Sequence, residues 1–302
     1  MPFFSIIVPT YNRVTLLKET LTTVTQQLFR DFEVIVVDNG SSDSTEDYAN
    51  IFTRDKRFKY IRSKINNERS WSRNKGLGVA NGKFVTFLDS DDFMYPNCLE
   101  AARDFVIQNP GCVAFHNLYE LVSSERSVVH RFHFPSLDNQ YKALASSNFV
   151  SCIGGFLGES VYPSIRFNED PRMIGAEDYE VWFDVLARFR LGRINQVNSG
   201  IREHPARSVH HGVYDNLSYQ EEQLVAKIIN SPLLYEKFGR WIPRLKANFC
   251  FQRAMLSKDQ GNRSLAAHLV AMGFYEDPSI IFNRRSWSVT YNLFKSFRIF
   301  RR

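Results

Sequence analysis

The chain has 302 residues, 44% of them hydrophobic and 23% charged, which allows one large α/β domain or one domain with an appendage. Its apolar runs fall short of the roughly 20 residues that a membrane span needs, and its four cysteines show neither a CxxC pair nor metal-ligand spacing. The net charge of +6 is uneven, because residues 240–302 alone carry a balance of +9. The basic character therefore belongs to the C-terminal segment.

The N-terminal sequence MPFFSIIVPTYNR predicts a strand of the fold rather than a targeting segment. It has neither a basic leader nor a small-residue cleavage site, so we expect no signal peptide. Scattered cysteines without a disulfide pattern fit a reducing compartment. Together these features predict a cytoplasmic protein.

The first 120 residues alternate short buried strands with helices. Repeated βα units of this kind predict a mostly parallel, Rossmann-like central sheet flanked by helices on both faces. The expected strands cover residues 4–10, 32–38, 58–63, 83–89 and 112–121, and the expected helices cover 16–28, 44–54, 72–81 and 98–110.

Beyond residue 120 the pattern changes twice. Residues 125–215 indicate loops with short segments, apart from a helix expected over 175–189, where Trp182 and Val185 share an apolar face. Residues 216–302 are expected to be helical and basic.

Three polar clusters follow three of the expected strands: PTYNR after the first, DNGSSD after the second and DSDD after the fourth. Ligands of open α/β folds bind beyond the carboxyl ends of strands, near the topological switch point. Neither GxGxxG nor GxxxxGK[ST] occurs at these junctions, so a dinucleotide fingerprint and a P-loop are excluded. We therefore expect a nucleotide pocket of another kind at this edge of the sheet.

Three carboxylates, Asp89, Asp91 and Asp92, crowd into four positions at the end of the fourth strand. Such groups repel one another and lose hydration unless a positive charge neutralises them. One interpretation is a divalent cation such as Mg²⁺ or Mn²⁺, which takes carboxylate oxygens and keeps positions open for substrate phosphates. The alternative is turn chemistry, with these residues leading into a helix that begins near Tyr95-Pro96.

Five polar motifs follow one another along the chain: Pro9-Thr10-Tyr11-Asn12, Val37-Asp38-Asn39-Gly40-Ser41-Ser42-Asp43, Ser72-Arg73-Asn74-Lys75-Gly76, Leu88-Asp89-Ser90-Asp91-Asp92 and Glu177-Asp178. In their order and at these strand ends, they resemble the motifs of the family-2 glycosyltransferases, which have the GT-A fold. The likeness covers residues 3–210. It implies a GT-A domain over 1–215, with a nucleotide-sugar-binding half at 1–120 and an acceptor-side half at 121–215, followed by a helical, basic extension at 216–302.

The resemblance implies inverting transfer of a sugar from a nucleotide diphosphate sugar, with a UDP-sugar favoured, to an acceptor hydroxyl. A divalent cation, Mn²⁺ or Mg²⁺, would stabilise the negative charge that grows on the leaving diphosphate. By resemblance Asp91 is its direct ligand and Asp89 assists from the ribose side or through the metal's water shell. His204 would complete the metal shell or touch the diphosphate. The alternative for His204 is a surface-loop histidine, and Asp92 is expected only to cap the next helix.

The donor site that the resemblance implies draws on several strand ends. Thr10 and Tyr11 would line the base and ribose, and Asp38 and Asn39 would lie at the nucleobase. Arg73 would neutralise the diphosphate or brace the nucleotide, because its fork of donors suits phosphate, and the alternative is a solvated helix charge. The implied donor-binding residues are Pro9, Thr10, Tyr11, Asp38, Asn39, Arg73, Asp89 and Ser90.

Two positions depart from the commonest pattern of this family. Asn39 stands where a second acid is usual, and because its amide can donate as well as accept, the nucleobase stays open. Glu68 stands where glycine is frequent in a turn, which predicts a change in the local loop and carries no assigned role.

The acceptor hydroxyl needs a base in line with its attack, because its pKa lies far above 7. By resemblance this catalytic base is Asp178, with Glu177 orienting the acceptor or donor. The alternative is that both acids only stabilise the N-terminus of their helix.

Residues 280–302 interleave aromatic side chains with six Lys or Arg residues and contain no acid. Such a segment suits a helix in the membrane interface, which predicts a peripheral position on the cytoplasmic face and a lipid-linked saccharide acceptor in cell-surface polysaccharide or glycan assembly. The alternative is packing on the catalytic domain. Nucleic acid is not an expected partner, because the remainder of the chain is acidic.

Two other functions share part of this signature. A nucleotidyltransferase also uses carboxylates and a divalent ion, but it needs a glycine-rich loop after the first strand, which PTYNRVTLL lacks. A non-catalytic nucleotide-sugar-binding GT-A protein would keep the fold without the chemistry, yet all the expected acids are present.

Overall fold

The computed structural model describes residues 1–125, 127–204, 207, 216–282 and 290. They divide into two compact units. The first, called the sheet unit, consists of Met1–Pro135 and Val150–Arg207, and the second, called the helical unit, of Ser136–Phe149 and Ser208–Arg302. The domain boundary expected at residue 215 stays a prediction.

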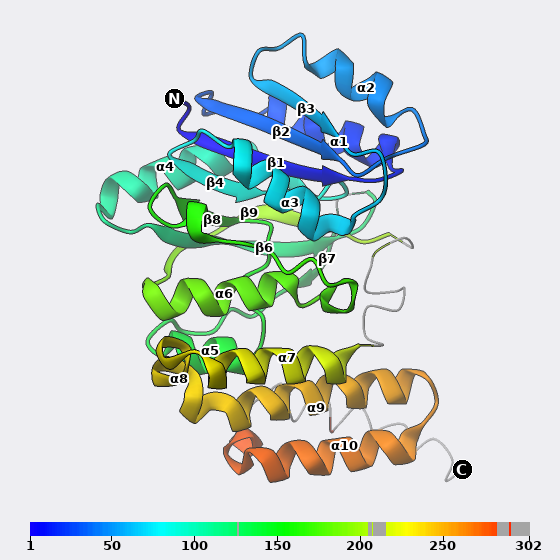
Figure 1. Cartoon of the computed structure of the whole chain (residues 1–302), viewed down its shortest axis with the longest axis vertical. Coiled ribbons are helices and arrows are strands. Elements are labelled where there is room, and N and C mark those ends of the chain that lie inside the picture. The colour runs from blue at the N-terminus through cyan, green and yellow to red at the C-terminus, as the bar shows by residue number, and fades with distance from the viewer. Residues whose placement is uncertain (126, 205–206, 208–215, 283–289, 291–302) are drawn as a thin grey trace. The chain divides into compact units, whose positions relative to one another are not determined.

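The sheet unit contains the α/β architecture that the sequence predicts (Figure 1). Its strands are β1 (Phe4–Thr10), β2 (Phe32–Asp38), β3 (Phe58–Arg62), β4 (Phe84–Phe87), β5 (Phe93–Met94), β6 (Ala114–Val122), β7 (Val128–Arg131), β8 (Gly155–Gly158) and β9 (Gly192–Arg202). Its helices are α1 (Val14–Thr25), α2 (Thr45–Phe52), α3 (Glu68–Val79), α4 (Cys98–Gln108) and α6 (Glu177–Arg188).

Within the described residues, the strands form one sheet in the order β3-β2-β1-β4-β8-β6-β9-β5, with β7 paired to β6. The pairings of β1 with β2 and β4, of β2 with β3 and of β6 with β9 are parallel. Strand β8 lies antiparallel between β4 and β6, so these two strands also share one direction. The carboxyl ends of β1, β2, β4, β6 and β9 therefore meet at one edge, and the predicted mostly parallel sheet is confirmed.

Alternating side chains of β1 face two different helix layers. Phe4, Ile6 and Val8 belong to one buried cluster with side chains of α1 and α4. On the opposite face, α3 approaches β1 closely at Gly76, where an added Cβ would lie 2.4 Å from Cγ2 of Ile7. Helices thus cover both faces of the sheet, which leaves the strand ends as the place where polar side chains can meet.

The segment expected to be loops, residues 125–215, contains more regular structure than predicted. Strand β9 was missed because it lacks an apolar pattern: Asn198 and Ser199 are fully buried within it. The Ser199 hydroxyl exchanges hydrogen bonds with the side-chain amide of Asn117 on β6, at 3.2 and 3.3 Å. A strand stabilised by such tertiary hydrogen bonds carries no periodic signal in its own sequence.

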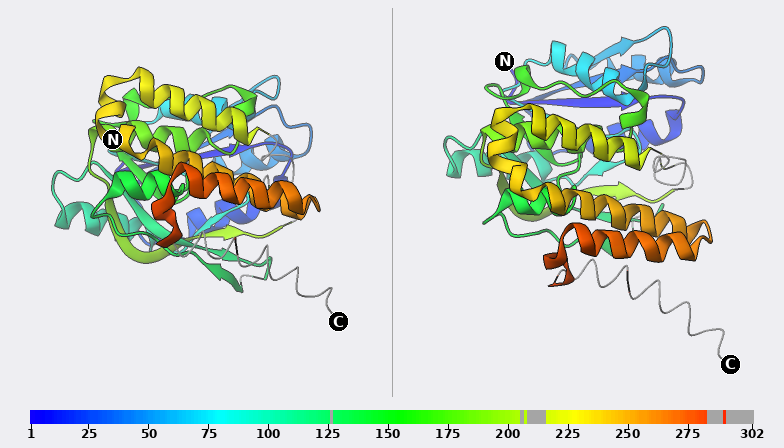
Figure 2. Two further views of the ribbon diagram at one scale, coloured as in Figure 1. Left: turned by 90° about the horizontal axis from the view of Figure 1, so that it is seen from below. Right: turned by 60° about the horizontal axis from the view of Figure 1, so that its bottom comes forward.

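The helical unit consists of α5 and the predicted C-terminal helices, which the structure confirms. Its α9 and α10 pack along each other around Phe251, Leu269 and Val270 (Figure 2). Gly261, at φ +83°, makes the turn between them. The helices are α5 (Gln140–Ser146), α7 (Leu217–Asn230), α8 (Pro232–Phe238), α9 (Ile242–Asp259) and α10 (Arg263–Glu276).

Among the described helices, none combines the length and the hydropathy that a membrane span requires. The basic, aromatic segment expected to contact a membrane lies outside the described residues, apart from residues 280–282 and 290.

Candidate active site

The loops after β1 and β2 are joined by hydrogen bonds that fix them as one surface. The backbone N–H of Asn39 donates to the carbonyl of Thr10 at 2.9 Å. Asn12, at φ +47°, donates its N–H to Ser41 Oγ at 2.9 Å and accepts from the N–H of Ser42 at 2.7 Å. The first two predicted polar motifs therefore lie side by side, as their strand ends require.

Asp38, predicted at the nucleobase, is a fully buried carboxylate with partners inside the protein. Its Oδ1 accepts from the N–H of Ser41 at 2.9 Å, and its Oδ2 accepts from the Tyr60 hydroxyl at 2.5 Å. Burial and the hydrogen bond to Asp38 raise the pKa of Tyr60, so this phenol stays a donor. Asp38 thus holds the loop after β2 in place through hydrogen bonds inside the protein.

Asn39 anchors the turn that leads into α3. Its Nδ2 donates to Oδ1 of Asn66 at 2.5 Å, and its Oδ1 accepts from the N–H of Asn67 at 2.9 Å. Glu68 follows at φ +67°, the left-handed conformation that favours glycine, and the expected change of this loop stays a prediction. A carboxylate in place of Asn39 could not donate to Asn66, which gives the departure from the family pattern a structural basis.

Pro9, Thr10 and Tyr11 pass from β1 into the first loop. The Thr10 hydroxyl is buried and has no hydrogen-bond partner among the described residues. The Tyr11 side chain, in contrast, is 41% exposed. A ring at the surface next to a buried, unpaired hydroxyl is compatible with the predicted lining of the base and ribose by these residues.

The predicted acid cluster forms at the end of β4. Oxygens of Asp89, Asp91 and Asp92 lie within 4.8 Å of one another, in a turn where the N–H of Asp92 donates to the carbonyl of Asp89 at 3.0 Å. Ser90 is buried in the same turn. Three carboxylate oxygens at this spacing fit the hard ligand set of Mg²⁺ or Mn²⁺.

Two basic side chains contact Asp91, and both bind the same oxygen. Arg13 Nη1 lies 2.5 Å and His204 Nε2 lies 3.1 Å from Asp91 Oδ2. Burial raises the pKa of Asp91, but the hydrogen bond from His204 and the charge of Arg13 outweigh burial and leave the pKa below its usual range. His204, predicted beside the metal, therefore does reach the acid cluster.

Asp92 does not cap the following helix, so that prediction was wrong. Its Oδ1 accepts from the N–H of Arg202 on β9 at 3.0 Å, and the residue at the N-terminus of α4 is Asn97. Burial, together with the charges of Asp91 and Asp89, raises the pKa of Asp92 well above its usual range. The three acids are therefore not equivalent: the pKa of Asp91 is lowered, whereas that of Asp92 is raised.

Arg73 joins the acid cluster to the predicted catalytic acids. Its Nη2 lies 2.8 Å from Asp89 Oδ1, and its Nη1 lies 2.8 Å from Glu177 Oε1. Its guanidinium stands over the Phe167 ring at 5.3 Å. Arg73 is 1% exposed, which excludes the alternative of a solvated helix charge.

Glu177 and Asp178 open α6, and their environments separate their pKa values. Burial raises the pKa of Glu177, but the charges of Arg69 and Arg73 outweigh burial and lower it. Burial, and next the charge of Glu177, raise the pKa of Asp178 to about 7. Two adjacent carboxyls with diverging pKa values are typical of acid–base sites.

The sequence analysis assigned no role to Arg13, although it directly follows the first motif. It also missed Cys152, which is buried beside Arg73 and whose pKa burial raises well above its usual range. The position of Arg13 next to a recognised motif was an available signal. Cys152 lies in a segment without periodicity and gave none.

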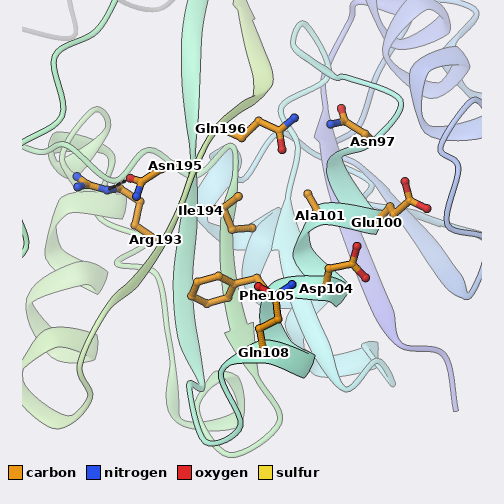
Figure 3. A pocket seen from close by; sticks show the side chains of 10 residues that line it. All are labelled: Asn97, Glu100, Ala101, Asp104, Phe105, Gln108, Arg193, Ile194, Asn195 and Gln196. Carbon is orange, nitrogen blue, oxygen red and sulfur yellow. Dashed lines mark hydrogen bonds between the residues drawn. The ribbon is translucent and has the colours of Figure 1, made fainter.

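A cavity of about 400 Å³ lies elsewhere, between α4 and the first residues of β9 (Figure 3). Phe105 and Ile194 line it, with Glu100 and Asp104 on its α4 side. This is the amino end of β9, whereas Arg202 at the carboxyl end contacts Asp92. The cavity is therefore separate from the acid cluster.

A family model described as glycosyl transferase family 2 matches residues 5–158. A Campylobacter jejuni GalNAc(5)-diNAcBac-PP-undecaprenol beta-1,3-glucosyltransferase is 41% identical over 179 residues, 56% of each chain. An Escherichia coli UDP-Glc:alpha-D-GlcNAc-diphosphoundecaprenol beta-1,3-glucosyltransferase is 28% identical over 191 residues, 63% of this chain and 72% of the relative. An uncharacterised glycosyltransferase of Rickettsia felis is 27% identical over 199 residues, and the matched region spans 32% of that relative's length.

Two solved structures share the fold. Staphylococcus aureus TarS 1–349 in complex with UDP-GlcNAc has a TM-score of 0.64 at 20% identity, covering 89% of this chain and 81% of TarS. The Pyrobaculum calidifontis mannosyltransferase PcManGT, in complex with GDP-Man and Mn²⁺, has a TM-score of 0.58 at 18% identity, covering 97% of this chain and 84% of the other. These similarities confirm the predicted GT-A type of fold.

Proposed function

The chain belongs to glycosyl transferase family 2, and from that premise we propose that it moves a sugar from a nucleotide diphosphate sugar to an acceptor hydroxyl, with inversion. The observation that carries the proposal is Asp178, a partly buried carboxyl whose pKa is raised to about 7, beside Glu177. Arg73 connects Glu177 to the acid cluster through two 2.8 Å contacts. A base and a donor site are thereby joined through one side chain.

The donor would bind along the carboxyl ends of β1, β2 and β4. A UDP-sugar is favoured, because the Escherichia coli relative is named for UDP-Glc. The buried Thr10 hydroxyl without a partner among the described residues supports a ligand at this position. The residues proposed to bind the donor are Pro9, Thr10, Tyr11, Asp38, Asn39, Arg73, Asp89 and Ser90.

Asp91 and Asp89 would hold a divalent cation, Mn²⁺ or Mg²⁺, with His204 close to the same carboxylate. The lowered pKa of Asp91 supports this assignment, because a ligand carboxylate has to be ionised. When bound, the cation would supply positive charge to the leaving diphosphate. The protein's own part is to keep Asp91 ionised and the turn fixed.

Asp178 would accept the proton of the acceptor hydroxyl. A pKa of about 7 suits this task, because a base with a pKa near the working pH combines ionisation with proton affinity. Glu177 would position the site rather than take the proton, since its carboxylate accepts from Arg73 at 2.8 Å and from the N–H of Gly175 at 2.5 Å.

The acceptor is proposed to be a lipid-linked saccharide in cell-surface polysaccharide or glycan assembly. Two relatives carry undecaprenol-linked saccharides in their names, and residues 280–302 of this chain are basic and aromatic. Cations near an anionic lipid surface hold a protein there at about 1 kcal/mol each. This supports a peripheral position on the cytoplasmic face.

The test is to incubate the protein with UDP-sugars, Mn²⁺ and an undecaprenyl diphosphate saccharide and to follow the released products. In this mixture a transferase releases UDP and extends the acceptor. In a separate incubation with a sugar phosphate and UTP, a nucleotidyltransferase would release pyrophosphate. A non-catalytic binding protein would show thermal stabilisation by the donor without either product. Asp184→Asn, on the same helix as Asp178, serves as a matched control for Asp178→Asn.

A further inference from the structure

One carboxylate oxygen of the acid cluster forms an ion pair with a basic side chain of the same protein. Asp91 Oδ2 lies 2.5 Å from Nη1 of Arg13 and 3.1 Å from Nε2 of His204. The same carboxylate is the proposed direct ligand of the divalent cation. A guanidinium and a divalent cation cannot both approach one oxygen closely without strong mutual repulsion.

The position of Arg13 is fixed by its neighbours in sequence. Asn12 is tied to Ser41 and Ser42 by hydrogen bonds of 2.9 and 2.7 Å, and the N–H of Val14 donates to Asp43 Oδ2 at 3.1 Å. The backbone on both sides of Arg13 is therefore attached to the loop after β2. Only the side chain is left to move, and it is 30% exposed, so it can leave Asp91 without unfolding the loop.

The same loop is the proposed donor site. Thr10 and Tyr11 precede Arg13 by three and two positions, so a guanidinium released from Asp91 stays next to the proposed nucleotide site. A diphosphate offers it a new anionic partner with bidentate geometry. The free energy lost when the Arg13 guanidinium leaves the carboxylate would thus be offset by its binding to the diphosphate.

We propose that Arg13 is an internal counter-ion of Asp91 that competes with the divalent cation and transfers to the diphosphate of the donor, so that cation and donor bind cooperatively. This inference rests on the proposed cation site. Without a donor, the cation has to displace Arg13 into solvent and binds weakly. With a donor, Arg13 has a second partner and the cation binds tightly, which is a coupling between two ligands through one side chain.

The competing explanation is that Arg13 and Asp91 form an ordinary surface ion pair. Such a pair exists between Arg57 and Asp55, where the nitrogen and oxygen lie 2.7 Å apart and the arginine is 31% exposed. Removing Arg57 should not affect the acid cluster. Arg57→Gln is therefore a matched control for Arg13→Gln.

The experiment measures free Mn²⁺ by its electron paramagnetic resonance signal during titration of the full chain, with and without UDP. Arg13→Gln should bind Mn²⁺ alone on the order of tenfold tighter than the wild type, and UDP should improve that affinity less than it does in the wild type. Arg13→Lys keeps the charge and should resemble the wild type. Arg57→Gln should be unchanged in both titrations.

Each alternative outcome is decisive. Equal or weaker Mn²⁺ binding by Arg13→Gln without UDP overturns the competition, provided that the wild type binds Mn²⁺ in the presence of UDP. An unchanged effect of UDP in Arg13→Gln overturns the transfer to the diphosphate. If neither wild type nor variants bind Mn²⁺ with UDP present, the proposed cation site itself is wrong and this inference falls with it.

Discussion

Arg73 and Glu177 stand 104 positions apart in the chain, yet Nη1 of the arginine donates to Oε1 of the glutamate across 2.8 Å, with both side chains buried. The second nitrogen of the same fork, Nη2, reaches Asp89. This single side chain connects α3, the turn after β4 and the start of α6. The proposed donor and acceptor sides therefore depend on one buried charge.

The first prediction concerns this connection. Arg73→Met should lower the free energy of unfolding by about 3 kcal/mol or more, because it leaves the buried Glu177 carboxylate without its cation. The measurement is urea denaturation. Arg172→Met, which breaks an ion pair whose arginine is 57% exposed, should cost less than about 1 kcal/mol.

A double substitution separates the charge effect from lost packing. Arg73→Met combined with Glu177→Gln should be more stable than Arg73→Met alone, because the unpaired buried charge is gone. Additive losses in this cycle would mean that Arg73 acts through its packing against Phe167 rather than through the ion pair.

The sequence predicted the strands in which apolar residues form a pattern and missed a strand in which they do not. β1 and β2 begin and end at the predicted residues, because each is a continuous buried run followed by polar residues. β9 was missed, because its buried Asn198 and Ser199 interrupt any apolar pattern, and Ser199 hydrogen-bonds to Asn117 on another strand. Hydrophobic periodicity reports burial, and it cannot report a strand held by buried polar groups.

Some contacts of the candidate site could also be predicted from the sequence, and others could not. The carboxyl ends of parallel strands had to bring Thr10, Asn39 and the turn at Asp89 to one edge, and the structure places them there. The contact of Arg73 with Glu177 could not be predicted, because no local pattern specifies a pairing over such a separation. The ion pair between Arg13 and Asp91 could likewise not be predicted, because it depends on the conformation of two loops.

The second prediction concerns the cation. Asp91→Asn keeps the shape of the side chain but removes the charge, so turnover should collapse in EDTA-treated, Mn²⁺-restored buffer while the fold survives. Circular dichroism checks the fold, and Asp55→Asn, a surface acid paired with Arg57, is the control for a lost ion pair. Wild-type turnover by Asp91→Asn would show that the metal assignment is wrong.

The third prediction concerns pH. Because the base acts only when ionised and the pKa of Asp178 is about 7, kcat/KM should fall about tenfold per pH unit below 7 and level off above it. Glu177→Gln removes a neighbouring negative charge that raises this pKa, so the inflection should move to lower pH. An inflection that stays at the same pH in this variant would assign the titration to another group.

The fourth prediction concerns the C-terminal segment. The full chain should co-sediment with vesicles that contain anionic lipid, and a chain ending at Phe282 should not, because the six cations of residues 283–302 are removed. Cutting after Phe282 preserves Ile280, which packs in the core of the helical unit. Neutral vesicles are the control, and equal binding by both chains, or none by either, would contradict a membrane role for this segment.

The proposal that Asp178 is the base of a glycosyl transfer is tested most directly by measuring UDP binding and sugar transfer in the same Asp178→Asn variant. Transfer should fall by about 10²–10⁴-fold, whereas calorimetry should give nearly the wild-type affinity for UDP with Mn²⁺, because the side chain acts on the acceptor. Asp184→Asn should retain both properties. Loss of UDP binding together with transfer, or transfer at the wild-type rate, would contradict the account.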